Sequence, residues 1–193
     1  MAATEPRWPD PAAGWVFLPA AGALLLHAPV LRYDLLGGLH RPIDGGLELR
    51  GRRLFGDNKT WRGALVMFTG AFAATAGLSR FRWFRDRLPE DVAAAPVPVY
   101  GALLGLGVVA GELPTSFVKR QLGIAPGRRA PATLAPLFSL YDQGDIVLGS
   151  AVTLRPVWRP TARELAGAFG AVSAVHFVFN VVGYAIGARD TAI

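Results

Sequence analysis

Apolar and polar positions alternate along the chain in long blocks. Five blocks are apolar and nearly free of charge, near residues 15–31, 63–79, 96–111, 133–154 and 165–187. A helix that crosses a bilayer needs about 20 mostly apolar residues, with about 17 as the lower limit. The pattern therefore predicts an all-α integral membrane protein with about five transmembrane helices. Residues 1–193 then form a single membrane-embedded domain.

A soluble, alanine-rich helical bundle is the main alternative for the fold. The helices of such a bundle would show a polar stripe at the 3.6-residue period, and the block 63–79 shows almost none. The composition agrees with a membrane protein, since 18% of the residues are charged against about 25% in an ordinary soluble domain. The chain has no cysteine, which excludes disulfides, Cys-ligated zinc and thiol chemistry.

The positive charge predicts an orientation. With five spans, 12 of the 20 basic residues fall on the side that holds 32–62, 112–129 and the C-terminal tail. The positive-inside rule places that side in the cytoplasm. Nucleic-acid binding is excluded because the basic residues are spread over both sides without an aromatic stacking platform. We therefore expect a multi-pass protein of the cell inner membrane, with a polar site that faces the cytoplasm.

The first polar segment of interest precedes the block at 63–79. A turn-prone Gly-Asp-Asn sequence at 56–58 leads into Lys59 and Thr60 at the start of an uncharged helix, with Arg62 one turn on. Backbone N–H groups at such a helix start, together with the two cations, can cradle a phosphate. The alternative is a juxtamembrane basic cluster that binds anionic lipid head groups, and composition does not separate the two.

The second segment follows the block at 96–111. On a helix, Glu112, Ser116, Lys119 and Arg120 share one broad face. An acid, a hydroxyl and two bases on one face suit a metal–phosphate site. A helix end whose bases reach the lipid head groups explains Lys119 and Arg120, but it does not explain Glu112.

The third segment places Asp142 and Asp145 inside an apolar block. An acidic residue there costs about 2.5–3.5 kcal/mol on insertion scales, and such residues are functional candidates. At a spacing of three they share a helix face, and paired carboxylates are typical Mg²⁺ ligands beside substrate phosphates. An ion pair with a neighbouring segment is the structural alternative.

Polar residues in the other blocks have simpler interpretations. His176 and Asn180 share a face of the last block, which is typical of a polar pair that bridges helices. His27 in the first block has the pattern of a satisfied or interfacial histidine rather than a catalyst.

These segments, in this order, resemble the signatures of the CDP-archaeol synthase family. Its members are membrane cytidylyltransferases related to the phosphatidate cytidylyltransferases. The resemblance covers roughly residues 14–187 and rests on 42–44 with 56–63, 116–124, 142–145, and His176 with Asn180. The chain departs from the family in Glu112, where the family usually has aspartate after the glycine, and in its last four residues.

The resemblance implies transfer of CMP from CTP to a membrane lipid phosphate, with release of pyrophosphate and a requirement for Mg²⁺. The acceptor is an isoprenoid-ether or a diacyl glycerol phosphate, and a homo-oligomer is left open. The implied catalytic residues are Lys119, Asp142 and Asp145, and the implied metal ligands are Asp142, Asp145 and Glu112. The implied nucleotide-binding residues are Gly56, Asp57, Asn58, Lys59, Thr60 and Arg62, and the implied phosphate clamp is Ser116, Lys119 and Arg120. The alternative function is a polytopic transporter that uses Asp142 and Asp145 as an ion site.

Overall fold

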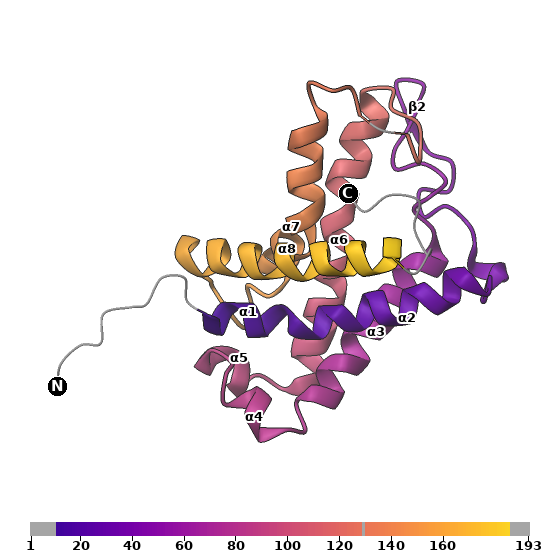
Figure 1. Ribbon diagram of the computed structural model, residues 1–193. Coiled ribbons are helices and arrows are strands. Elements are labelled where there is room, and N and C mark those ends of the chain that lie inside the picture. The colour runs from indigo at the N-terminus through magenta and orange to yellow at the C-terminus, as the bar shows by residue number, and fades with distance from the viewer. Residues whose placement is uncertain (1–10, 129, 186–193) are drawn as a thin grey trace.

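The protein is mostly helical in the computed structural model, which describes residues 11–128 and 130–185 (Figure 1). The first long helical stretch consists of α1 (Pro11–Phe17), the 3₁₀ turn η1 (Leu18–Ala20) and α2 (Ala21–Arg32). The other long helices are α3 (Trp61–Leu78), α6 (Val97–Gln121), α7 (Ala135–Thr153) and α8 (Ala162–Ala185). The short elements are η2 (Gly37–Leu39), the antiparallel strands β1 (Glu48–Leu49) and β2 (Arg52–Arg53), α4 (Arg82–Arg85) and α5 (Glu90–Ala94).

Local chemistry explains where α3 begins and where α6 ends. Thr60 precedes α3 in an extended conformation, and its hydroxyl accepts a hydrogen bond from the backbone N–H of Gly63 at 3.1 Å, which is an N-cap. After α6 the chain turns at Gly123, whose φ of +76° lies in the left-handed region. Its N–H donates to a carbonyl in the last turn of α6 at 2.9 Å, as in a glycine C-cap.

The predicted blocks match the long helices, with two differences. The first block is divided by η1, which contains Pro19. The third block is predicted at 96–111, and the helix that forms there, α6, continues through Pro114 to Gln121. A proline inside a helix removes one backbone hydrogen bond, yet the helix continues. The polar face of 112–120 is therefore built on the same helix as the apolar stretch before it.

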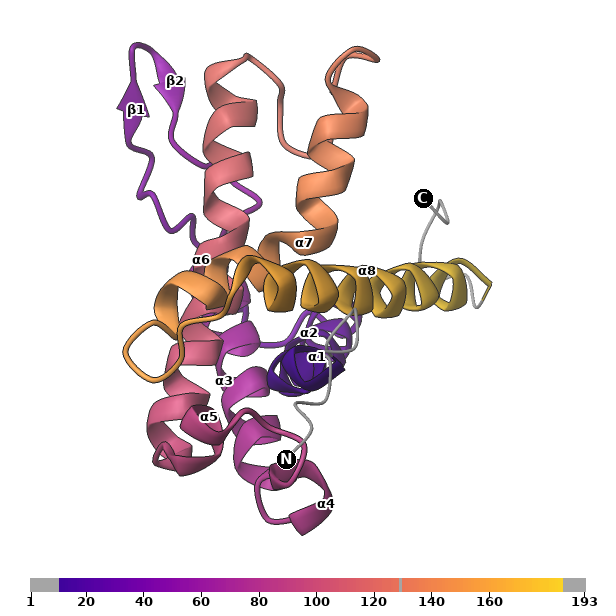
Figure 2. The ribbon, with the colours of Figure 1, turned by 90° about the vertical axis from the view of Figure 1, so that its left-hand side faces the viewer.

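The helices do not all run in the same direction. In both Figure 1 and Figure 2, α6 and α7 stand upright side by side, and α8 lies across them. The hairpin of β1 and β2 lies beside the last turns of α6, whereas α4 and α5 lie at the opposite end of the molecule (Figure 2). These two ends are called below the hairpin end and the α4–α5 end.

Glycines allow α6 and α7 to approach each other closely. A methyl group added at Gly107 or Gly111 on α6, or at Gly149 on α7, would fall on the backbone of the facing helix. Small residues are what permits such close packing between helices in membranes. As a result, the acidic residues of α7 lie directly beside the polar face of α6.

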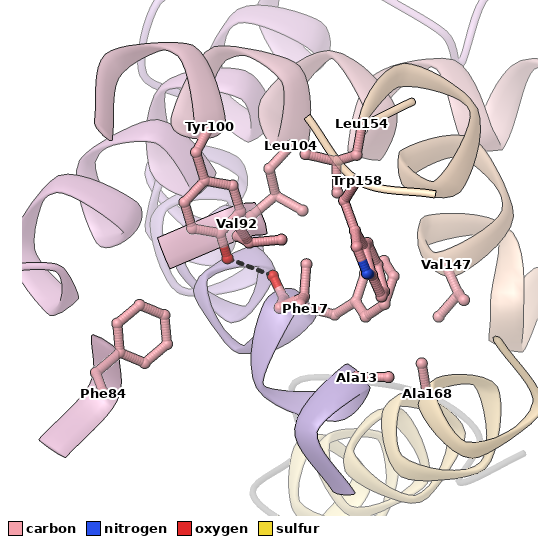
Figure 3. Close-up of a cluster of buried hydrophobic side chains, with 11 residues drawn as sticks. Ala13, Phe17, Phe84, Val92, Tyr100, Leu104, Val147, Leu154, Trp158 and Ala168 are labelled. Carbon is pink, nitrogen blue, oxygen red and sulfur yellow. Dashed lines mark hydrogen bonds between the residues drawn. The ribbon is translucent and has the colours of Figure 1, made fainter. Parts of the chain in front are cut away.

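The larger apolar cluster lies where α1, α6, α7 and α8 meet (Figure 3). Tyr100 of α6 is buried in it, and its hydroxyl donates a hydrogen bond to the backbone carbonyl of Val16 at 2.6 Å. A buried hydroxyl without a partner would cost about 1–3 kcal/mol, so this bond accommodates the tyrosine and ties α1 to α6. Phe84 of α4 and Val92 of α5 join the same cluster, which fastens the α4–α5 end to the long helices.

Two helical stretches are long and apolar enough to cross a membrane within the described residues. They are Ala13–Arg32, which combines α1, η1 and α2, and Val97–Gln121, which is α6. The predicted number of five spans is therefore not confirmed here, and the other three stay a prediction.

Candidate functional site

The loop between α2 and α3 is held by the buried carboxylate of Asp44. One oxygen accepts hydrogen bonds from the backbone N–H of Gly46 at 3.0 Å and from the Arg53 guanidinium at 2.6 Å. The other accepts from the backbone N–H groups of Phe55 and Gly56, both at 3.0 Å. Burial raises the pKa of the Asp44 carboxyl, but these donors outweigh it and hold that pKa well below its usual range. Asp44 is therefore ionised, and it fixes the chain just before Lys59.

Gly56 and Asp57, both expected in the nucleotide pocket, lie in this loop rather than in the wall of the cavity described below. Gly56 has a φ of +86°, which favours glycine, and it packs beside the side chain of Arg120. The Asp57 carboxylate is 74% exposed and pairs with Arg53 at 2.7 Å. Gly56 thus shapes the turn, while Asp57 supports the loop from outside.

Lys59 and Arg62, at the start of α3, each have an acidic partner. The Lys59 ammonium donates to the Glu112 carboxylate on α6. Arg62 is buried, and its guanidinium donates to the Asp34 carboxylate and, at 3.2 Å, to the carbonyl of Leu35. The hydrogen bond from Arg62 lowers the pKa of the exposed Asp34 carboxyl. The cations are therefore tied to the end of α2 and to α6.

The polar face of α6 is organised by contacts within the helix and with α7. The Ser116 hydroxyl donates to the backbone carbonyl of Glu112 at 2.9 Å, so its hydrogen is used inside the helix. The Lys119 ammonium donates to the Asp142 carboxylate on α7 at 2.7 Å and lies 5.1 Å from the centre of the Phe138 ring. Lys119 therefore links α6 to α7 across the site.

Arg120 differs from the other cations of the site. Its residue is 8% exposed, and neither its Nε nor one of its terminal nitrogens has a hydrogen-bond partner among the described residues. A buried charge without partners is costly. The guanidinium therefore has unused donors that an anion entering the cavity can satisfy.

Asp145 on α7 is buried, in contrast to the half-buried Asp142 one turn before it. One oxygen of Asp145 accepts a hydrogen bond from the N–H of Ile146 at 2.6 Å. The backbone of Asp145 lies against Gly111, the residue before Glu112. The seam between α6 and α7 thus brings the three predicted carboxylates to one side of the site.

A polar cavity of about 860 Å³ gathers most of the predicted site residues. Its wall comes from α2, the start of α3, the second half of α6, the loop after α6 and the first half of α7. The predicted residues that line it are Asn58, Lys59, Thr60, Arg62, Glu112, Ser116, Lys119, Arg120, Asp142 and Asp145. Predicted residues from three separate segments of the chain therefore meet in one place.

A small apolar cleft adjoins the polar cavity. It lies between α1, η1 and α2 on one side and α7 and α8 on the other. Leu24 of α2 and Ile146 of α7 line both the cleft and the cavity. The two spaces therefore meet at these residues, so that a polar group and an apolar chain of one ligand could occupy them together.

The carboxylates suit a metal ion only if a ligand supplies further donors. Within 11–128 and 130–185 no three His, Asp or Glu side chains lie close enough to hold an ion by themselves. Mg²⁺ is usually held by one or two carboxylates together with substrate phosphates. The combination of Asp142, Asp145 and Glu112 with cations in one cavity has that chemistry.

Several residues of the site were not predicted as such from the sequence. His27, His40 and Arg128 line the cavity, and Asp44 and Asp34 hold residues around it. Nothing local marks His27, because its neighbours on α2 are apolar. His176 and Asn180 lie in α8, but their side chains fall outside the part of the chain that the structure describes.

Comparison with known proteins gives a consistent family. The model of the family described as CarS-like, CDP-archaeol synthase, matches residues 15–193. The chain is 33% identical to the CDP-archaeol synthase of Halobacterium salinarum, over 91% of this chain and 92% of the relative. It is 33% identical to that of Aeropyrum pernix, with 86% and 88% covered, and 34% identical to that of Methanopyrus kandleri, with 91% and 89% covered.

A solved structure is also similar. It is described as an intramembrane enzyme for archaeal membrane lipids biosynthesis, and it superimposes with a TM-score of 0.61 at 34% identity. The match covers 88% of this chain and 92% of the other. The chain therefore resembles this enzyme in fold as well as in sequence.

Proposed function

Because the chain belongs to the CDP-archaeol synthase family, we propose that it transfers CMP from CTP to a membrane lipid phosphate. An oxygen of the lipid phosphate attacks the α-phosphorus of CTP, and the bond from that phosphorus to the oxygen of the β-phosphate breaks. The products are a CDP-activated lipid and pyrophosphate. The chain is then a CTP-dependent cytidylyltransferase of phospholipid biosynthesis.

The observation that carries this proposal is the meeting of ten predicted polar residues in one cavity that shares two lining residues with an apolar cleft. A reaction between a nucleotide and a lipid needs a polar space for two phosphate groups and an apolar path for a hydrocarbon chain. The apolar path is the cleft that begins at Leu24 and Ile146. The transporter alternative gains no support from the relatives.

The residues of the cavity fit the needs of this reaction. The lipid phosphate is already an anion, so no strong general base is required. The barrier comes from bringing two polyanions together and from charge on the leaving pyrophosphate, which positioned cations reduce. Lys59 and Arg62 on one wall and Lys119 and Arg120 on another are the groups that bind these phosphates. Asn58 and Thr60 shape the wall beside them.

The carboxylates have two roles in this proposal. Without substrate, Glu112 and Asp142 neutralise Lys59 and Lys119. Asp142, Asp145 and Glu112 are also the residues that would hold Mg²⁺, which when bound neutralises charge on the triphosphate. A lysine that turns to a phosphate leaves its carboxylate partner available.

We propose an isoprenoid-ether glycerol phosphate as the preferred acceptor, because the relatives are named as CDP-archaeol synthases. A diacyl glycerol phosphate is the competing acceptor. The direct test offers the purified protein labelled CTP with Mg²⁺ and each lipid phosphate in turn, and measures the CDP-lipid formed. Product from the ether lipid supports the proposal, and no product from any lipid phosphate overturns it.

The orientation in the membrane belongs to the same proposal. We infer a multi-pass protein of the cell inner membrane, with five spans and the hairpin end in the cytoplasm, from the distribution of basic residues. Since the chain has no cysteine, single cysteines at Arg50 and at Arg85 can be labelled by an impermeant maleimide from either side of a vesicle. Labelling of both from the same side would contradict the orientation.

A further inference from the structure

His27 faces the polar cavity from α2, a helix whose other cavity-lining residues, Leu24 and Leu31, are apolar. A methyl group built on Gly63 would lie 3.7 Å from its Nε2, so this ring nitrogen is placed beside the first turn of α3. The described residues give its ring no hydrogen-bond partner, although charged side chains surround it, namely Glu112, Arg62 and Lys59. The ring can therefore donate a hydrogen bond to a ligand.

The position of His27 relates it to the lipid rather than to the nucleotide. It follows Leu24 by one helical turn, and Leu24 lines both the cleft and the cavity. An amphiphile whose chain fills the cleft passes between Leu24 and Ile146 before its phosphate reaches polar groups. His27 lies one turn beyond Leu24 on α2, and Asp145 directly precedes Ile146 on α7. Of these two residues only the histidine can donate a hydrogen bond to an anion, with the cations at the start of α3 near it.

The cations at the far end of α6 lie well away from this passage. Val109 packs against the apolar cluster that contains Ile146, which places it at the level of the passage. Lys119 follows ten residues later, which is about 15 Å along a helix. A triphosphate bound at Lys119 and Arg120, with its Mg²⁺ at Asp145, therefore reaches the level of the passage with one end only, and the second substrate enters there.

We propose that His27 binds the phosphate of the lipid substrate, through a hydrogen bond donated by its ring, where the apolar cleft enters the polar cavity. This inference rests on the proposed function, since it concerns the lipid acceptor of that reaction. It names a binding residue that discriminates between the two substrates and that the sequence motifs do not contain.

The test compares the KM values for the two substrates. In His27→Ala, we expect the KM for the lipid phosphate to rise about tenfold, as for a lost hydrogen bond to a charged group, while the KM for CTP stays within about twofold. His27→Gln retains an N–H donor of similar reach and should show a smaller rise. Leu25→Ala is the matched control, because Leu25 is on the same helix, 63% exposed, and lines neither space.

Each outcome separates this inference from the function on which it rests. If the wild-type protein forms no CDP-lipid, the proposed function fails first. If the wild type is active and His27→Ala leaves the KM for the lipid unchanged, or raises both KM values equally, the assignment of His27 is wrong. Stabilisation of both His27 variants by CTP in a thermal shift assay establishes that they are folded. A KM for the lipid that rises less in His27→Gln than in His27→Ala tests the hydrogen bond independently.

Discussion

The two ends of the molecule use the same residue, arginine, in different ways. At the hairpin end, Arg62 and Arg120 are buried in the wall of the cavity, and Arg53 joins two carboxylates. At the α4–α5 end, Arg87 lies over the rings of Trp15 and Trp83, with its guanidinium carbon 5.3 and 5.9 Å from their centres. Both ends have several basic residues in the sequence, and the polar cavity lies at the hairpin end.

The difference shows that the environment of a basic residue, rather than the number of such residues, indicates function. Exposed arginines beside tryptophan are typical of a membrane–water interface, and Trp83 is exposed. At the hairpin end, five ion pairs surround one cavity and its loop. Fixed charges in a partly enclosed space can bind phosphates in a set geometry.

The largest expected effect comes from removing a charge at the seam between α6 and α7. Asp145→Asn keeps the size of the side chain but removes its negative charge, and we expect CMP transfer to fall at least about 100-fold. Asp86→Asn makes the same change at an exposed position of the α4–α5 end and should leave turnover unaltered. The rate of CDP-lipid formation measures both, and turnover near wild type in Asp145→Asn would remove the carboxylate mechanism.

The second largest effect is expected on the KM values when a buried arginine of the cavity loses its charge. Arg120→Gln removes buried donors without partners, and we expect the KM for at least one of the two substrates to rise about 10- to 100-fold, which corresponds to about 1.5–3 kcal/mol for a hydrogen bond to a charged group. Arg82→Gln, the same change at the α4–α5 end, should alter neither KM. Equal KM values in the two variants would mean that the ends do not differ as described.

The third effect is on stability as well as on binding. Asp44→Asn replaces an acceptor oxygen with an amide among N–H donors, which should lower the stability by about 2 kcal/mol and the Tm by about 4–8 °C. Because folding lowers the pKa of Asp44 from its ordinary 3.8, this stabilisation is complete above that value and is lost as the pH falls below it.

Thermal unfolding of the wild type and Asp44→Asn at a series of pH values checks this sign. The difference in Tm should be constant between about pH 8 and 5 and should narrow below about pH 4. A difference that widens in acid would show that the carboxylate does not hold the loop in the way described.

The smallest effect is expected in the apolar cluster, away from the cavity. Tyr100→Phe removes the hydrogen bond to the Val16 carbonyl, so we expect a loss of about 1 kcal/mol and a Tm lower by about 2–4 °C. CMP transfer at a temperature where the variant is folded should be unchanged. A large loss of turnover would instead couple the apolar cluster to the cavity.

The sequence predicts much of this fold because apolar blocks and motif order are local properties. The block at 63–79 becomes α3, and the block around Asp142 becomes α7. The extent of α6 is less visible in the sequence, because the charged residues beyond 111 end the apolar block but continue the helix as its polar face.

The missing parts of the site depend on contacts between distant segments. Asp44 acts through backbone N–H groups eleven and twelve positions later, which no spacing of side chains reveals. Asp57 belongs to the predicted motif, but its pairing with Arg53 turns it to the outside of the loop. His27 matters only because α2 lies against the start of α3.

The contact between Gly111 and the Asp145 backbone limits which substitutions evolution can accept at position 111. Any side chain at 111 would meet the carbonyl oxygen of Asp145 and push α7, with its acidic residues, away from α6. The next position carries no such restriction, because the Glu112 side chain extends into the open cavity. Position 112 can therefore carry either aspartate or glutamate. The glycine at 111, in contrast, must be kept for α6 and α7 to stay at the same distance.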